Sequence, residues 1–255
     1  MANGNRCDSK SLLFVDKELC CNFVCELINY RVMMGTELTV VDLINCAKEF
    51  CAKESGIFRE ELFGVTDGKA VGTFVERLFK SYLSEHYDLT MGSSANGLDL
   101  PSVNTDIKVT SIRQPQSSCP YKDSRQKIYG LGYNLIVFVY KKEDDEQQKK
   151  GKLTFLSCTF VDAKRTADYQ LTTGLLSIIK NNGNADDIFA FLSDHKIPAD
   201  EVTLSNMAAE ILKNPPAIGY LTISNALQWR LQYGRIVALN ENIEGITPIV
   251  KYDSK

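Results

Sequence analysis

Histidine is scarce in this chain of 255 residues, which contains only His86 and His195. No two of its eight cysteines form a C-x-x-C pair, and six of them fall in the first fifth of the chain. A zinc site built on Cys21 and Cys25 would therefore lack the usual further cysteine and histidine ligands. Buried, reduced thiols explain the cysteines better, because a chain of this length buries enough surface to fold without disulfides.

The sequence also lacks an apolar run that could serve as a signal peptide or reach the roughly 18 residues of a membrane helix. We therefore expect a cytoplasmic protein with reduced thiols and no membrane partner. Neither G-x-G-x-x-G after a strand nor G-x-x-x-x-G-K-[ST] occurs. Without either phosphate-binding loop, no nucleotide cofactor is expected.

An excess of positive charge is missing as well, since the formal net charge is −3. This excludes a histone-like protein that coats nucleic acid, because such binding needs many lysines and arginines against the phosphates. The basic residues are nevertheless concentrated. Residues 101–142 hold seven of them against two acids, and residues 213–237 hold three and no acid. Two basic tracts therefore lie on an acidic background.

Apolar positions recur at helical spacing on both sides of a strand-rich centre. Two or three helices are expected within residues 11–63, and single helices over 69–86, 168–182, 184–195, 203–213 and 222–237. Strands are expected up to Asp99 and over 106–112, 133–140 and 153–161, with 141–152 as a solvated hairpin tip. This order predicts a single α+β domain, residues 1–255, with a mixed central sheet flanked by helices. It comprises a helical N-terminal region (1–66), a core (67–165) and a helical C-terminal region (166–255).

The segment GLDLPSVNTDIKVTS carries the strongest chemical signal. Asp106 and Lys108 are two residues apart on a predicted strand, so they project from the same face. Asp99 ends the preceding run, which can turn back and bring its carboxylate beside that of Asp106. Two such carboxylates need a cation, and hard oxygen ligands suit Mg²⁺. An ammonium beside the metal can orient or deprotonate water, or neutralise a developing phosphate charge.

Glu76 is a candidate third acid of this cluster. It lies in KAVGTFVERLF, next to the buried stripe of a predicted helix. By itself it could equally be a solvent-pointing residue at the edge of that stripe.

These features resemble the PD-(D/E)XK nuclease signature, in which an acid on a helix precedes Asp, a short span and Asp/Glu-x-Lys on a strand. The chain is most similar to the branch of the mismatch-repair nicking enzyme MutH and related restriction endonucleases. The resemblance covers residues 68–140, including Gly68-Lys69, Gly72, Gly92-Ser93 and a further basic stretch around Lys127. The proline that names the motif is absent before Asp99, the middle acid is Asp, and the order Gly68-Lys69 is inverted.

The resemblance implies a type II restriction endonuclease that cuts double-stranded DNA with Mg²⁺, leaving 5′-phosphate and 3′-hydroxyl ends. It implies catalytic roles for Asp99, Asp106, Lys108, Glu76 and Lys127, the three acids being metal ligands. Two alternatives stay open, a mismatch-repair nicking endonuclease and a noncatalytic DNA-binding regulator. A double-strand cut at a palindrome is most simply made by a two-fold homodimer.

Two segments carry side chains suited to DNA. The stretch after the catalytic strand offers Arg113, Gln114, Gln116, Ser117, Ser118, Lys122 and Arg125. The predicted C-terminal helix offers Gln228, Arg230, Gln232 and Arg235, and with helix 203–213 it could form a helix-turn-helix-like unit. Alternatively, this last helix only caps the core through Trp229.

Overall fold

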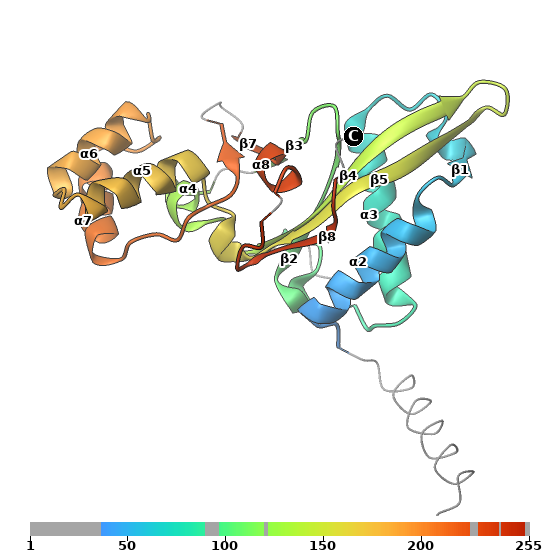
Figure 1. The fold of residues 1–255 in the computed structure, drawn as a ribbon, viewed down its shortest axis with the longest axis horizontal. Helices are drawn as coiled ribbons and strands as arrows, with labels where there is room; N and C mark the ends of the chain where they lie inside the picture. Colours follow the sequence, from blue (N-terminus) through green and yellow to red (C-terminus); the bar gives the residue numbers. More distant parts are fainter. Residues whose placement is uncertain (1–36, 90–96, 120–121, 225–228, 240, 253–255) are drawn as a thin grey trace, which may run out of the picture.

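The computed structural model describes residues 37–89, 97–119, 122–224, 229–239 and 241–252 (Figure 1). Its centre is a mixed five-stranded sheet with strand order β1-β5-β4-β2, to which β8 adds by pairing with β5. The strands are β1 (Phe58–Arg59), β2 (Thr105–Ser111), β4 (Asn134–Asp145), β5 (Lys150–Val161) and β8 (Ile246–Val250). β2 and β4 run parallel, whereas the other pairs are antiparallel. The predicted α+β fold with a mixed sheet is confirmed.

Two helices cover one face of this sheet, α2 (Val40–Glu54) and α3 (Gly68–Ser84) (Figure 1). Thr39 caps α2 in a capping box with Asp42, and the Asp67 carboxylate caps α3. Phe50 of α2 and Phe79 of α3 pack against Phe138 of β4. The predicted helix 69–86 is confirmed, but residues 55–63 form β1 and the short helix η1 (Glu60–Leu62) instead of helix. Residues 11–36 lie outside the described part of the chain.

The β4–β5 hairpin is longer than the sequence predicts. Strand pairing continues through the charged segment to the Asp145–Lys150 pair. Glu143 stands opposite Lys152 in this register, and their charged groups are 3.5 Å apart. Opposite charges across the strands favour pairing, which explains why a segment without apolar residues is still a strand.

The opposite face of the main sheet packs against a small sheet with strand order β3-β7-β6. Its strands are β3 (Gln116–Cys119), β7 (Trp229–Gln232) and β6 (Thr222–Ile223), followed by the short helix α8 (Gly234–Val237). The predicted helix over 222–237, and with it the helix-turn-helix-like unit, is wrong. Residues 229–232 alternate between buried and exposed, and this period of two, together with pairing to β3, selects a strand. Trp229 is buried, as the alternative predicted.

The C-terminal helices form a separate layer with its own apolar core, at the far end of the molecule from α2 and α3 (Figure 1). They are α5 (Tyr169–Lys180), α6 (Ala185–Asp194) and α7 (Glu201–Lys213), which confirm three predicted helices. Three short helices complete the structure, α4 (Gln126–Tyr129), η2 (Pro101–Val103) and η3 (Ala163–Arg165). No helix in the described part of the chain is long and apolar enough to cross a membrane.

Candidate active site

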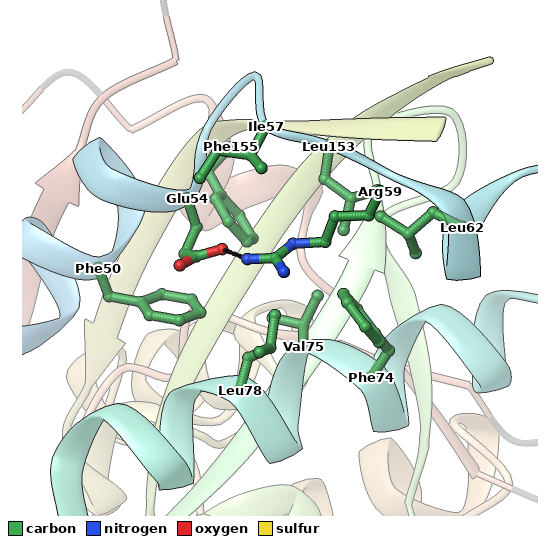
Figure 2. Close-up of a pocket in the computed structure, with 10 residues that line it drawn as sticks. All are labelled: Phe50, Glu54, Ile57, Arg59, Leu62, Phe74, Val75, Leu78, Leu153 and Phe155. Atoms are coloured by element: carbon green, nitrogen blue, oxygen red, sulfur yellow. Dashed lines mark hydrogen bonds and ion pairs between the residues drawn. The ribbon is translucent and has the colours of Figure 1, made fainter. Parts of the chain in front are cut away.

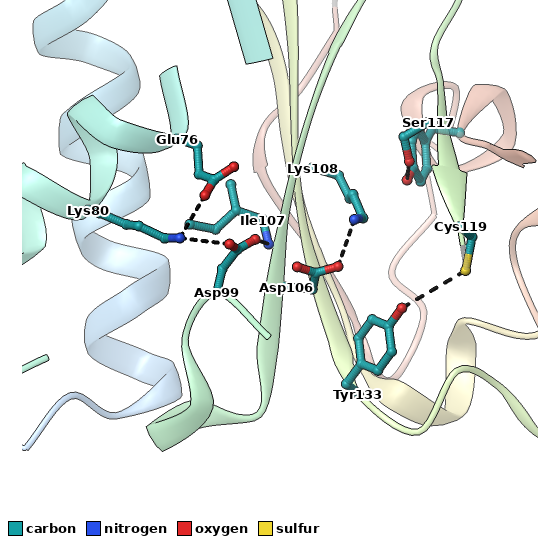
Figure 3. A network of polar contacts seen from close by, with 10 residues as sticks. Glu76, Lys80, Asp99, Asp106, Ile107, Lys108, Ser117, Cys119 and Tyr133 are labelled. Carbon is teal, nitrogen blue, oxygen red and sulfur yellow. Dashed lines mark hydrogen bonds and ion pairs between the residues drawn. The ribbon is translucent and has the colours of Figure 1, made fainter. Parts of the chain in front are cut away.

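The edge strand β2 presents Asp106 and Lys108 on the same face, as their spacing predicts (Figure 3). Lys108 Nζ lies 2.7 Å from Asp106 Oδ2, and the two side chains are 19% and 9% exposed. Ile107 between them points the other way and joins the core under α3. The chemical pair therefore lies on the face of the main sheet that the small sheet covers.

Asp99 is folded back against β2 by a tight turn. Leu100 and Thr105 exchange two backbone hydrogen bonds of 3.0 and 3.1 Å, and Asn104 closes the turn in the left-handed conformation, with φ 47°. The Ile107 N–H then donates to Asp99 Oδ2 at 2.9 Å. The expectation that this run turns back beside the second strand is confirmed by the bond to Ile107.

Lys80 is a member of the site that the sequence reasoning missed. Its Nζ on α3 lies 2.6 Å from Glu76 Oε1 and 2.7 Å from Asp99 Oδ1, so it joins the helix to the turn (Figure 3). The four-residue spacing between Glu76 and Lys80 was a readable signal for an ion pair on one helix face. The contact with Asp99 requires the tertiary structure.

The carboxyl groups of Asp99 and Asp106 titrate as a pair. Burial, together with the hydrogen bond that its protonated form makes to Asp99, raises the pKa of Asp106 to about 6, although Lys108 opposes this. Burial also pushes the pKa of Asp99 upward, but hydrogen bonds from Asp106, Lys80 and the Ile107 amide outweigh it and lower the pKa to about 2. Burial raises the pKa of Glu76, against the effect of Lys80. Burial thus raises the pKa of Glu76 and Asp106, and the neighbouring lysines offset only part of this effect.

One cavity of about 550 Å³ opens in front of these groups. Its described lining includes Glu76, Asp99, Asp106, Lys108, Lys122, Gln126 and Tyr133. A second cavity, between α2, α3 and β5, has a volume of only about 10 Å³ (Figure 2). It is apolar apart from the ion pair of Arg59 with Glu54, and its volume is at the lower limit needed to hold one water molecule. The large polar cavity is therefore the candidate site.

Lys127 is not among the described residues that line this cavity. Its side chain is 4% exposed, and its Nζ lies 5.6 Å from the centre of the Trp229 ring. Burial lowers the pKa of its ammonium group, against the charge of Asp168. Lys122, five residues earlier, reaches the cavity instead. The basic stretch does supply a lysine to the site, but the structure places a different one there.

The predicted DNA-contacting residues have different surroundings. Arg113 and Gln114 are exposed in the turn between β2 and β3, and Arg230 is exposed on β7. Ser117 points into the protein, where its hydroxyl lies 2.5 Å from that of Tyr233.

Two predicted DNA contacts are occupied by protein groups. Arg125 Nε donates to Glu210 Oε2 at 3.0 Å, which ties α4 to α7. The Arg235 guanidinium lies 3.5 Å from the centre of the Tyr169 ring. Gln228 and the Gly92-Ser93 pair lie outside the described residues.

A metal ion would find two well-placed carboxylates here, those of Asp99 and Asp106. Among the described residues no three His, Cys, Asp or Glu side chains are grouped to hold an ion, and Glu76 and Asp99 are each paired with Lys80. Mg²⁺ is commonly bound through one or two carboxylates, with water and substrate phosphate completing its shell. The two acids at a wide polar cavity fit such an ion.

The region that is similar to known proteins includes the residues of this site. The family model of the type II restriction enzyme NspV matches residues 37–248. The type II restriction enzyme NspV of Nostoc sp. (strain ATCC 29411 / PCC 7524) is 52% identical over 216 residues, which are 85% of this chain and 98% of the relative. No solved structure matches. The family match includes α3, β2 and every strand of both sheets except the end of β8, so the chain belongs to the NspV family of type II restriction enzymes.

Proposed function

We propose that this chain cuts both strands of double-stranded DNA at a specific base sequence, with Mg²⁺ held at Asp99 and Asp106. Its family makes it a type II restriction enzyme, a site-specific deoxyribonuclease that binds DNA. We further propose that its core is of the PD-(D/E)XK type, from the MutH-related branch. One observation carries the assignment of the site: Asp106, Lys108 and Asp99 meet at the edge of β2 and line one cavity.

Asp99 and Asp106 are the proposed direct ligands of the metal ion, and Glu76 is the third acid that faces the cavity. Type II restriction enzymes generally use a divalent metal, and two carboxylates favour Mg²⁺. When bound, such an ion supplies a Lewis acid for the phosphate and a more acidic water molecule. The Ile107 amide and Lys80 hold the Asp99 carboxylate in place through separate oxygens.

Lys108 is the proposed group that acts on the scissile phosphate. Its ammonium group is held by Asp106 and lines the cavity, so it can donate to a phosphate oxygen or orient the attacking water. Lys122 adds a second positive charge at the cavity. We propose that Lys122 takes the place in the site that the sequence assigned to Lys127.

Three further proposals concern the working form of the enzyme. A two-fold homodimer would place one site on each strand of a palindromic sequence. We also propose that the enzyme acts in the cytoplasm and needs no nucleotide cofactor. Sedimentation of the enzyme with a cognate duplex tests the homodimer, and cleavage in buffer that contains Mg²⁺ but no nucleotide tests the cofactor proposal.

A supercoiled plasmid incubated with the enzyme and Mg²⁺ tests the function. We expect linear fragments with fixed ends, and mapping those ends gives the recognition sequence. Nicked circles would favour the mismatch-repair type of nicking endonuclease, and unchanged plasmid would favour a noncatalytic DNA-binding regulator. Family membership supports the first outcome over the other two. The Asp106→Ala variant, prepared in parallel, controls for contaminating nucleases.

A further inference from the structure

The small sheet has a polar face that is turned away from the protein core. On β7, Trp229 and Leu231 are buried, whereas Arg230 and Gln232 are exposed. In the strand register, Gln232 stands opposite Gln116 of β3 and Thr222 of β6, while Arg230 stands opposite Ser118. Side chains opposite each other in a sheet point to the same side. The outer face of the small sheet therefore consists of Gln116, Ser118, Thr222, Arg230 and Gln232.

The inner face fixes the orientation of this surface. Cys119, Trp229 and Leu231 belong to the core between the two sheets. Ser117 shares the inner face and bonds to the buried Tyr233 hydroxyl. A slip of one residue would move this apolar set into water, so the register is strongly specified.

The outer face has free hydrogen-bonding groups and a favourable charge for DNA. Arg230, Gln232 and Gln116 make no side-chain hydrogen bond or ion pair within the described residues. Residues 107–122 and 211–239, which supply all three strands, contain no Asp or Glu. A surface of amides, hydroxyls and one guanidinium without acids suits base edges beside phosphates.

The outer face is also tied to the catalytic strand. Thr110 of β2 accepts a hydrogen bond from the Gln116 amide at 3.1 Å, and its hydroxyl lies 3.0 Å from the Gln116 carbonyl oxygen. Lys122, three residues beyond β3, lines the cavity of the acid cluster. The position of β3 relative to Asp106 and Lys108 is thus set by a direct contact between its first residue and the strand that carries both.

We propose that the outer face of the small sheet reads the recognition sequence in the major groove, through Arg230, Gln232 and Gln116. The major groove admits a two-stranded β-ribbon, and β3 paired with β7 provides one. Arginine pairs with guanine and glutamine with adenine through two hydrogen bonds each. This inference rests on the proposed function. It assigns recognition of the DNA sequence to the small sheet in place of the helix predicted over residues 222–237.

The experiment compares cleavage of the cognate duplex with cleavage of duplexes that carry one substituted base pair. Arg230→Lys keeps the charge but loses the planar fork, so it separates base reading from attraction to phosphate. We expect Arg230→Lys and Gln232→Ala to lower kcat/KM on the cognate duplex about 5- to 150-fold, with a smaller loss on one substituted duplex. Gln147→Ala, an exposed change at the tip of the β4–β5 hairpin, serves as a matched control with wild-type discrimination.

The outcomes separate this inference from the proposed function. A wild-type enzyme that fails to cut DNA overturns both. A wild-type enzyme that cuts, with outer-face variants that discriminate normally, overturns only the inference. Equal losses on cognate and substituted duplexes also overturn it, because the residues would then contact the phosphate backbone. Melting temperatures of the exposed variants show that each one is folded.

Discussion

The acid cluster, formed by Glu76, Asp99 and Asp106, and the outer face of the small sheet differ in how their polar side chains are paired. In the acid cluster, Lys80 and Lys108 pair with Glu76, Asp99 and Asp106, and the groups are partly or largely buried. On the outer face, the described side chains of β3 and β7 are free and point to solvent.

The difference indicates a division of labour. Paired charges inside a low-dielectric site hold a fixed arrangement, which is what a reaction centre needs. Unpaired amides on a rigid strand can exchange water for base edges without first breaking protein hydrogen bonds. Changes in the first region should therefore abolish cutting, whereas changes in the second should alter which sequence is cut.

The largest effect should come from removing an acid. Asp99→Ala or Asp106→Ala should lower the cleavage rate on the order of 10³-fold or more, because each variant removes one of the two proposed direct ligands of the metal. Binding of the cognate duplex in Ca²⁺ should persist, since the reading surface is untouched. Gel shifts in Ca²⁺ and cleavage in Mg²⁺ measure the two properties separately. Near-normal cutting by either variant would show that the site lies elsewhere.

The next effect contrasts two lysines. Lys108→Ala should lower the cleavage rate about 10²- to 10³-fold with cognate binding retained, because a charge at the phosphate is lost. Lys127→Ala should cost about 0.5–3 kcal/mol of stability through lost packing, with the rate per folded molecule unchanged. Cleavage assays and thermal melts on both variants provide the data. A well-folded Lys127→Ala protein that fails to cut would show that Lys127 has the catalytic role that the sequence predicted.

The pH dependence of stability without metal gives a third, smaller effect. The pKa of Asp106 is raised from 3.8 to about 6, so between these values the folded protein keeps a proton that the unfolded chain has lost. The free energy of unfolding should therefore fall as pH rises from about 4 to 6, by on the order of 1–3 kcal/mol. Asp99, with its pKa lowered to about 2, acts oppositely, and its contribution is lost as pH falls below 4.

Asp106→Asn isolates this contribution. Melting curves in a chelator at several pH values should show the fall between pH 4 and 6 in the wild type and a flatter profile in the variant. Parallel profiles would mean that Asp106 holds no extra proton in the folded state.

The sequence alone predicts those features of the acid cluster and the fold that depend on residues close together in the chain. The two-residue spacing of Asp106 and Lys108 on one strand is visible without a structure, as are the helices that Asp67 and Asp168 cap. The contact of Lys80 with Asp99 joins residues 19 positions apart and needs the folded turn.

The small sheet shows why the rest could not be predicted. Trp229, Arg230, Leu231 and Gln232 fit a strand, yet Leu227 and Leu231 also fit a helical spacing, and four residues do not decide between them. The residues of the strand partner, β3, lie 110 to 116 positions earlier in the chain, so the pairing that selects a strand is visible only in three dimensions. Ser117 and Ser118 were therefore indistinguishable in the sequence, although the sheet points them to opposite faces.

Substitutions of Ser117 and Ser118 should give the smallest and most selective effects. Ser117→Ala removes the hydroxyl that bonds to the buried Tyr233, so it should cost about 1 kcal/mol of stability and leave sequence discrimination unchanged. Ser118→Ala, one residue away on the outer face, should leave the melting temperature unchanged and weaken discrimination a few-fold at one base pair. Thermal melts and cleavage of singly substituted duplexes, applied to both variants, measure these effects in adjacent residues of one strand. If Ser117→Ala changed discrimination and Ser118→Ala changed only stability, the assignment of the two faces would be reversed, and sequence reading would have to move to the turn that carries Arg113 and Gln114.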